Sequence, residues 1–268
     1  MAPVIASVAG GAVKEYMAVA RQAALLAGRL LRDNFGGKRT IAFKGAINLV
    51  TEMDTQAERV VVETLLHAFP DHGILAEEEA TRENGSPFRW IIDPLDGTTN
   101  YAHGYPCFAV SLALESAGEV IVGVVYDPMR DELFSAGKGQ GAFLNGNPLN
   151  VSSVDNLIQS LLATGFPYDR CVSEKNNINH FTELLMASQE VRRDGSAALD
   201  LCSVAAGRFD GFWELKLKPW DVAAGILIVR EAGGTVSDFR GMRSSIYDQE
   251  VVASNGRIHR QMLTLLQK

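Results

Sequence analysis

The sequence predicts a mixed fold of α-helices and β-strands in two halves, an α+β half over residues 1–150 and an α/β half over residues 151–268. Two observations lead to this prediction. The first half opens with amphipathic helical segments and continues with apolar runs of strand length. The second half alternates short apolar runs with helical segments, which is typical of a sheet with helices on its faces. We expect the two halves to share a continuous interface, because no linker divides them.

The first half begins with a predicted helix over residues 12–35, where small and apolar residues recur at three- and four-residue steps. A glycine pair ends this run. A second helix, capped by Thr51 or Asp54, ends at Phe69 before a proline. Runs of strand length lie at residues 41–45, 74–76, 90–92, 108–115, 120–126 and 132–136.

The second half predicts a regular alternation of elements. Its expected strands are residues 161–164, 191–193, 210–215, 235–238 and 251–253. Its expected helices are residues 174–188, 196–206 and 221–231, with a last helix from about residue 257. The glycine-rich segment 137–141, just before this half, lacks the spacing of a phosphate-binding loop and therefore predicts a turn.

Composition excludes several classes of protein. The net charge of −7, with no basic run, argues against direct binding of nucleic acid. The three widely spaced cysteines argue against a disulfide framework or a zinc cluster and are typical of a reducing cytoplasm. No signal peptide is recognisable, and no run reaches the roughly 18 apolar residues of a membrane span. We therefore expect a cytoplasmic protein that does not enter a membrane.

Two carboxylates stand beside a group of hydrogen-bond donors in residues 88–101. Asp93 ends an apolar run, Asp96 follows, and the next residues, Gly97 and Thr98, stand where a helix or turn could begin. Carboxylates repel phosphate, whereas the backbone N–H groups of a helix start attract it. A site that holds both groups indicates a hard divalent cation that bridges their oxygens.

Two further acids occupy similar positions. Glu77 directly follows a short apolar run, and Asp221 stands just before a helical run. Taken alone, the first would be a solvated strand end and the second an N-cap. Together with Asp93 and Asp96 they make four carboxylates, too many for one magnesium ion and suited to two or three. Zinc is disfavoured, because these segments contain no histidine or cysteine.

The segments 90–100 and 220–225 resemble the two signature motifs of the inositol monophosphatase family. The order and spacing of further residues agree with this resemblance: Lys44, Asp54, Glu77, Glu78, the segment 194–198 and Glu214. The resemblance extends from about residue 12 to residue 266. The segments 127–130 and 163–167 are most similar to the bacterial inositol-1-monophosphatases.

The resemblance implies a layered αβαβα sandwich of the inositol monophosphatase and fructose-1,6-bisphosphatase type. It implies hydrolysis of inositol-1-phosphate to inositol and phosphate by direct attack of water, with two to three Mg²⁺ ions and no covalent intermediate. The expected substrate is thus a small phosphorylated polyol. A homodimer and inhibition by lithium are also implied.

The resemblance also assigns roles to individual residues of this chain. The implied metal ligands are Glu77, Asp93, the carbonyl oxygen of Leu95, Asp96 and Asp221, with Asp93 shared by two ions and a weaker third ion near Glu77. Thr98 and Glu77 would orient the attacking water, and Asp54 would assist through a loop that carries Lys44. The implied substrate contacts are Asp96, Gly97, Thr98, Gly195, Ser196, Ala197, Glu214 and Asp221.

The chain departs from the family pattern at two positions. Glu79 stands where a serine is frequent, and Asn48 stands where an acid is usual. Both changes concern the third ion and the lysine loop, and neither removes an implied metal ligand.

Several alternative functions share part of this pattern. A haloacid-dehalogenase-type phosphatase needs an aspartate at position 94, where this chain has Pro94, so that class is excluded. Arg192 and Arg193 could pair with the second phosphate of fructose 1,6-bisphosphate, although they could equally be surface or interface residues. Nucleotide 3′-phosphatases and histidinol-phosphate phosphatases have the same metal motifs. Some bacterial relatives are partners in transcription and ribosomal RNA synthesis, so a binding role is a further alternative.

Overall fold

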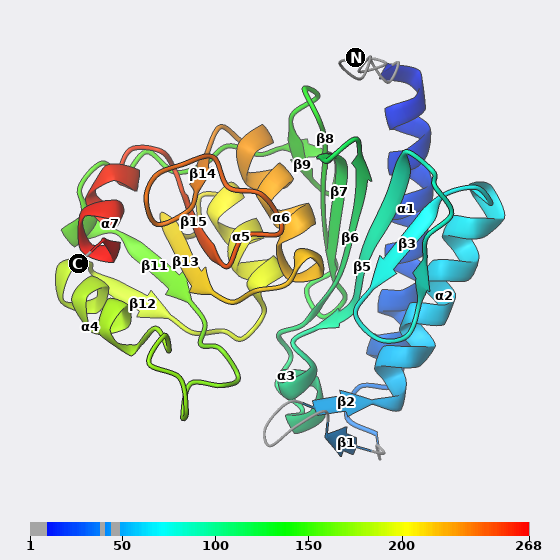
Figure 1. The fold of residues 1–268 in the computed structure, drawn as a ribbon, viewed down its shortest axis with the longest axis horizontal. Coiled ribbons are helices and arrows are strands. Elements are labelled where there is room, and N and C mark those ends of the chain that lie inside the picture. The colour runs from blue at the N-terminus through cyan, green and yellow to red at the C-terminus, as the bar shows by residue number, and fades with distance from the viewer. Residues whose placement is uncertain (1–9, 38–40, 44–48, 268) are drawn as a thin grey trace.

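The computed structural model describes residues 10–37, 41–43 and 49–267. Lys44 and Asn48 lie outside the described residues. The described part forms five layers, in the order helices, sheet, helices, sheet, helices (Figure 1). The predicted αβαβα sandwich is therefore confirmed.

The first large sheet has eight strands in the order β10-β9-β8-β7-β6-β5-β3-β4. Their bounds are β3 Gly73–Ala76, β4 Thr81–Arg82, β5 Phe88–Asp96, β6 Ala109–Ser116, β7 Glu119–Asp127, β8 Glu132–Gly137, β9 Ala142–Leu144 and β10 Asn147–Pro148. Every neighbouring pair is antiparallel except β3 and β5, which run parallel. Two long helices, α1 (Gly10–Asp33) and α2 (Glu52–Ala68), cover its outer face (Figure 1).

The second sheet has five strands in the order β12-β11-β13-β15-β14. Their bounds are β11 Leu161–Thr164, β12 Glu190–Arg192, β13 Gly211–Leu215, β14 Thr235–Ser237 and β15 Glu250–Ser254. Helices α4 (Ile178–Ala187) and α7 (His259–Leu266) lie on its outer side (Figure 1). The remaining small elements are β1 Ile41–Phe43, β2 Leu49–Thr51, α3 Thr98–His103 and the short 3₁₀ helix Leu157–Gln159.

The central layer consists of α5 (Ala197–Ala205) and α6 (Pro219–Glu231), which lie between the two sheets (Figure 1). All eight residues from Val222 to Val229 are buried, as expected for a helix covered on every side. Contact with the first sheet is close at Gly123, where a Cβ atom would lie 2.8 Å from the Ala224 carbonyl oxygen. The central helices are therefore held tightly between the sheets.

Most elements form where the sequence predicts them. The glycine-rich segment is a turn, as predicted, and its Gly139 and Gly141 N–H groups donate to the Glu231 carboxylate at 2.7 and 2.8 Å. Helix α4 begins at Ile178 rather than near residue 174, because the preceding chain forms a loop in which Lys216 binds Asp169 and Ser173. The strands of two or three residues, such as β4 and β10, are too short for an alternating pattern to predict.

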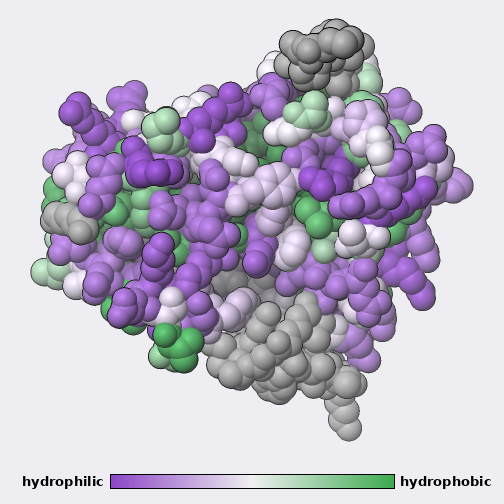
Figure 2. Space-filling view, in the orientation of Figure 1, coloured by the Kyte–Doolittle hydropathy of each residue, from purple (hydrophilic) through white to green (hydrophobic). Residues whose placement is uncertain are grey.

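The hydropathy of the surface and of the helices agrees with what the composition predicts. Hydrophilic residues dominate the face drawn in Figure 2, and the hydrophobic residues on it form small separate groups. Within the described ranges, no helix combines the length and the apolar character that crossing a membrane requires. The cysteines are unpaired, as their spacing predicts.

Candidate active site

Strand pairing brings Glu77 beside Asp93. Strands β3 and β5 are parallel, with Ala76 opposite Ile92, and the Glu77 N–H donates to the Ile92 carbonyl at 3.1 Å. The carboxyl ends of both strands therefore meet at one edge of the first sheet. Two acids separated by 15 intervening residues become neighbours there because each directly follows a buried apolar run.

A β-bulge brings Asp96 to the same place. Along β6, Asp93 lies opposite Ser111 and Asp96 lies opposite Ala109, so β5 has one residue more than its partner over this stretch. Side chains alternate along a regular strand, and residues three apart would point to opposite faces. The extra residue removes this separation. The bulge also turns the Leu95 N–H toward Asp93, where it donates to Oδ1 at 3.0 Å.

The four acids converge from three elements. Asp93 is only 1% exposed. Burial raises its pKa well above the ordinary value, and the charges of Glu77, Asp96 and Asp221 raise it further. Asp221 lies in the first turn of α6, and burial followed by the charge of Asp96 raises its pKa to about 8. These mutual effects show that the acids of both halves share one site.

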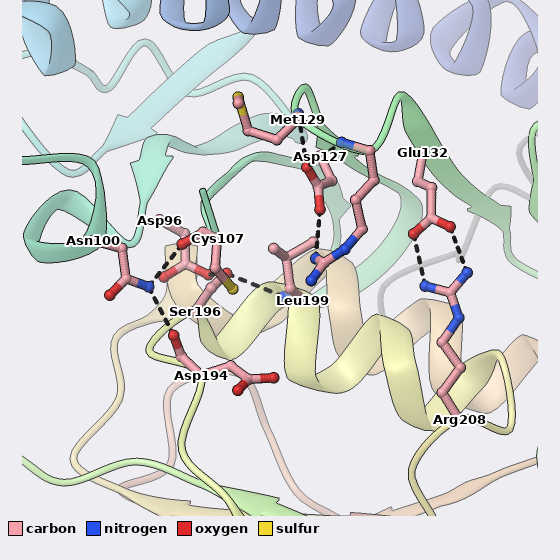
Figure 3. A network of polar contacts seen from close by, with 11 residues as sticks. Asp96, Asn100, Cys107, Asp127, Met129, Glu132, Asp194, Ser196, Leu199 and Arg208 are labelled. Atoms are coloured by element: carbon pink, nitrogen blue, oxygen red, sulfur yellow. Dashed lines mark hydrogen bonds and ion pairs between the residues drawn. The ribbon is translucent and has the colours of Figure 1, made fainter. Parts of the chain in front are cut away.

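Asp96 is held by the first turn of α5 from the second half. The Ser196 hydroxyl donates to Asp96 Oδ2 at 2.6 Å (Figure 3). The Ala198 N–H donates to the same oxygen at 2.8 Å. Burial raises the pKa of Asp96 to about 6, while these bonds, another from the Ala197 backbone and the charge of Arg193 oppose a larger rise. Ser196 and Ala197, which the sequence assigns to substrate binding, thus lie directly against an acid of the site.

Thr98 connects α3 with α2. Its hydroxyl lies 2.9 Å from Asp54 Oδ1 and 3.0 Å from the Leu95 carbonyl oxygen, so it can donate to either acceptor. The other Asp54 oxygen accepts from the Thr51 N–H at 2.8 Å and from the Thr51 hydroxyl at 2.6 Å. Burial raises the pKa of Asp54, and these hydrogen bonds lower it. Asp54 is therefore both a helix-capping acid and the partner of Thr98.

Glycine is required at the start of α3. Gly97 has φ +98°, and a Cβ atom there would lie 2.9 Å from the Cys107 carbonyl oxygen. The Asn100 side-chain amide donates to the carbonyl oxygens of Cys107 and Asp194, each at 2.7 Å (Figure 3). Asn100 thereby ties α3 to the segment that precedes Gly195. The sequence motif contains Asn100, but only the folded chain shows this role.

Glu214 projects from β13 beside Gly165. It is 8% exposed, and burial raises its pKa to about 8, while the charge of Arg193 lowers it and that of Asp96 raises it. A Cβ atom on Gly165 would lie 2.1 Å from a Glu214 carboxylate oxygen. Gly165 therefore leaves the space that the Glu214 side chain occupies. Sequence reasoning missed this role of Gly165, because the two residues are far apart in the chain.

Tyr168 also belongs to this site, and sequence reasoning missed it. Burial raises the pKa of its hydroxyl, and the charges of Glu77, Asp96, Asp221 and Asp93 raise it further, although 58% of the residue is exposed. The residue is thus largely exposed, while its hydroxyl is close enough to the four acids for their charges to act on it. A tyrosine three residues after a glycine carries no local signal of such a position.

The donor set fits hard divalent cations. The four carboxylates and the Leu95 carbonyl oxygen offer oxygen atoms alone, which is the ligand type that magnesium prefers. Within the described part of the chain, no three Asp, Glu, His or Cys side chains stand in a ready ligand arrangement. Asp96 instead accepts from Ser196, and Asp221 accepts from the Lys218 N–H at 2.6 Å. Ligation by these residues therefore stays a prediction.

Comparison with known proteins decides the family. The model of the inositol monophosphatase family matches residues 12–268. The chain belongs to the inositol monophosphatase family. Its membership confirms the resemblance seen in the sequence, and it makes the protein a phosphatase of this family, of the phosphomonoesterase class.

Similar proteins bear two kinds of name. The inositol-1-monophosphatase of Synechocystis is 46% identical over 252 residues, which cover 93% of this chain and 88% of that protein. The Nus factor SuhB of Escherichia coli K12 is 46% identical over 248 residues, which cover 91% and 93%. The structure of the inositol monophosphatase from Anabaena (Nostoc) has a TM-score of 0.88 at 43% identity and covers 96% of both chains.

Proposed function

We propose that this family member is a magnesium-dependent phosphomonoesterase that hydrolyses inositol-1-phosphate to inositol and phosphate. The observation that carries the proposal is the buried Asp93, whose pKa is raised by burial and by three other acids of the same site. Buried like charges are unfavourable by themselves and become favourable when cations lie between them. Retaining four such acids fits an enzyme that binds metal.

Glu77, Asp93, Asp96, Asp221 and the Leu95 carbonyl oxygen would hold two to three Mg²⁺ ions. Bound magnesium supplies positive charge that polarises the phosphate ester and lowers the pKa of a coordinated water. The ligands come from the first sheet and from α6 of the central layer, and this gives the site a rigid frame, because β5, β3 and α6 are all packed in the core.

Thr98 and Glu77 would orient the attacking water in this proposal. When the Thr98 hydroxyl donates to Asp54, its oxygen lone pairs are left to accept a hydrogen bond from water. Asp54 is fixed in turn by Thr51, so the acceptor of this hydrogen bond is in place before substrate binds. The N–H groups of Gly97 and Thr98 would receive phosphate oxygens, and Lys44 would act from the loop beyond the described residues.

The alcohol part of the substrate would meet Glu214, Asp221 and the segment Gly195–Ala197. A Glu214 carboxyl with a pKa of about 8 can accept or donate a hydrogen bond near neutral pH, which suits contact with polyol hydroxyls. Ser196 already donates to Asp96, so in this proposal its hydroxyl orients that acid as well as lining the alcohol site.

A magnesium-dependent substrate panel tests the proposal. The substrates are inositol-1-phosphate, fructose 1,6-bisphosphate, 3′-phosphoadenosine 5′-phosphate and histidinol phosphate. We expect the highest kcat/KM for inositol-1-phosphate, no turnover in EDTA and recovery on adding Mg²⁺. A preference for fructose 1,6-bisphosphate that R193A abolishes would favour the rival substrate. Inactivity of the magnesium-loaded protein on the whole panel would contradict a phosphatase function.

A second candidate role is that of a protein partner in transcription. The similarity to the Nus factor SuhB favours this role, and it is compatible with residual phosphatase activity in a cytoplasmic protein. Affinity capture of the native host's transcription components would test it. A homodimer and inhibition by lithium are part of the same proposal, and light scattering and an inhibition curve would check them.

A further inference from the structure

Helix α2 carries two acids on its buried face. The face comprises Met53, Asp54, Ala57, Glu58, Val61 and Leu65. Asp54 and Glu58 are 1% and 4% exposed, one helical turn apart, in a protein layer otherwise filled by apolar side chains. Burying a carboxylate is energetically unfavourable unless it is hydrogen-bonded, so each of these two acids must have hydrogen-bond partners. Asp54 has Thr51 and Thr98, and the partners of Glu58 lie elsewhere.

Glu58 binds the backbone of the segment that follows β3. Its carboxylate accepts three N–H groups: that of Glu78 at 2.9 Å, that of Glu79 at 2.9 Å and that of Ala80 at 2.8 Å. Three successive N–H groups that converge on one anion make a compact binding concavity. Bonds of this charge-assisted kind are about twice as strong as neutral ones. Helix α2 therefore binds the segment of residues 78–80 through the side chain of Glu58.

The segment that Glu58 binds, residues 78–80, begins directly after Glu77. The Ala76 N–H donates to the Ala80 carbonyl at 3.0 Å, and the Glu77 N–H donates to the Ile92 carbonyl at 3.1 Å. The chain from residue 76 to residue 80 is thus a closed loop with β5 on one side of Glu77 and Glu58 on the other. The backbone on both sides of Glu77 is therefore held by hydrogen bonds, which restrain the position from which its side chain projects.

We propose that Glu58 is a positioning residue, which holds the loop of residues 77–80 so that Glu77 faces Asp93 and the two acids can share a cation. The inference rests on the proposed metal-dependent function. Together with Asp54, it makes α2 the support for both groups expected to orient water: Asp54 holds Thr98, and Glu58 holds the loop that carries Glu77.

Substitution by glutamine separates positioning from packing. In E58Q the side-chain volume is kept, but the amide NH₂ group faces a backbone N–H, which places one donor against another. E58D keeps the charge and shortens the side chain by one methylene, about 1.5 Å, so the three bonds cannot all form. E63Q is the matched control, because Glu63 is an exposed acid on the same helix, and its ion-pair partner within the described residues is the exposed Arg59.

The measurement is calorimetric binding of Mn²⁺ to the full chain without substrate, at a temperature where circular dichroism shows each variant folded. We expect E58Q to raise the Mn²⁺ Kd about ten- to a hundredfold, the usual effect of losing a residue behind a metal ligand, and E63Q to leave it unchanged. E58D should raise Kd in the same way, and it carries the test if E58Q does not fold.

A lowered Tm with an unchanged Mn²⁺ Kd in folded E58Q or E58D would overturn the proposal and leave Glu58 with a structural role. If the wild-type protein binds Mn²⁺ but hydrolyses no phosphomonoester, the proposed function fails while the Kd ratio still decides the role of Glu58. Absence of Mn²⁺ binding by the wild type would overturn both.

Discussion

Asp93 and Asp96 lie three residues apart on one strand, yet their environments differ. Asp93 accepts one backbone N–H, and the charges that act on it are those of three acids, Glu77, Asp96 and Asp221. Asp96 reaches the second half and accepts a hydroxyl and an N–H at the start of α5. Accordingly, the pKa of Asp93 is raised well above its ordinary value, whereas that of Asp96 is raised only to about 6.

This difference shows what each half contributes to the site. The first half supplies most of the negative charge, at the ends of β3 and β5. The second half supplies donors at a helix N-terminus, where the N–H groups and the helix dipole favour an anion. In the proposed metal site, a cation would therefore compensate mainly the charge of Asp93, while that of Asp96 is already partly compensated by protein groups.

The largest effect should follow from removing the charge of Asp93, which has fewer hydrogen-bond donors than Asp96. We expect D93N to lower kcat about a thousandfold, because the proposed site would lose a ligand shared by two ions, and to leave the fold intact. Steady-state kinetics with saturating Mg²⁺ and circular dichroism check this. D33N, at an exposed acid of α1, is the control. Near-normal turnover in D93N would show that Asp93 does not bridge the ions.

Removing the donor from the second half tests the other side of the comparison. In S196A, Asp96 loses its 2.6 Å hydrogen bond, so the pKa of Asp96 should rise. Ionised Asp96 then requires a higher pH, and we expect the acid limb of the kcat/KM profile to move upward, with about a tenfold loss near pH 6. S203A, on the same helix, is the control. An unshifted profile would mean that Ser196 acts on substrate alone.

The raised pKa of the buried Glu214 carboxyl can be tested by measuring how the stability of the folded protein depends on pH. Folding raises its pKa from an ordinary value of 4.5 to about 8, so its favourable contribution is complete below pH 4.5 and is lost as the pH rises through about 8. In EDTA, E214Q should therefore match the wild-type Tm near pH 5 and exceed it by a few degrees near pH 9. Thermal unfolding at both pH values checks this, with E83Q at an exposed acid as the control. A Tm difference independent of pH would contradict a raised pKa.

The smallest effect is expected where the halves are joined by neutral hydrogen bonds. N100A removes the donor shared by the Cys107 and Asp194 carbonyl oxygens and should lower the free energy of unfolding by about 1 kcal/mol. KM should rise a few-fold, because the segment before Gly195 loses an anchor. Urea unfolding and substrate titration measure both quantities. A change in KM without loss of stability would instead indicate direct substrate contact.

Much of the fold could be predicted from sequence because its signals are local. The long helix α1 follows from three- and four-residue spacing, and the strands β6 to β8 follow from apolar runs separated by turns. The start of α4 was misplaced, because Lys216, some 40 residues later in the chain, binds the preceding loop. Boundaries that depend on such distant partners leave no local pattern.

The acids of the candidate site could be predicted from the sequence, since each of Glu77, Asp93 and Asp96 interrupts or follows an apolar run where packing would not place a charge. The sequence also indicates that a helix or turn begins at Gly97 and Thr98, and Gly97 is the N-cap residue of α3. These features depend on the properties of neighbouring residues, which a single sequence displays.

Only the tertiary structure decided how the acids are held. The bulge in β5, the bonds from α5 to Asp96, the Glu58 contacts with residues 78–80 and the space at Gly165 all join segments distant in sequence. Their energies depend on distances and burial that arise when the sheets and helices pack together. The physical reason is that hydrogen bonds and charge interactions act across space, whereas local propensity acts along the chain.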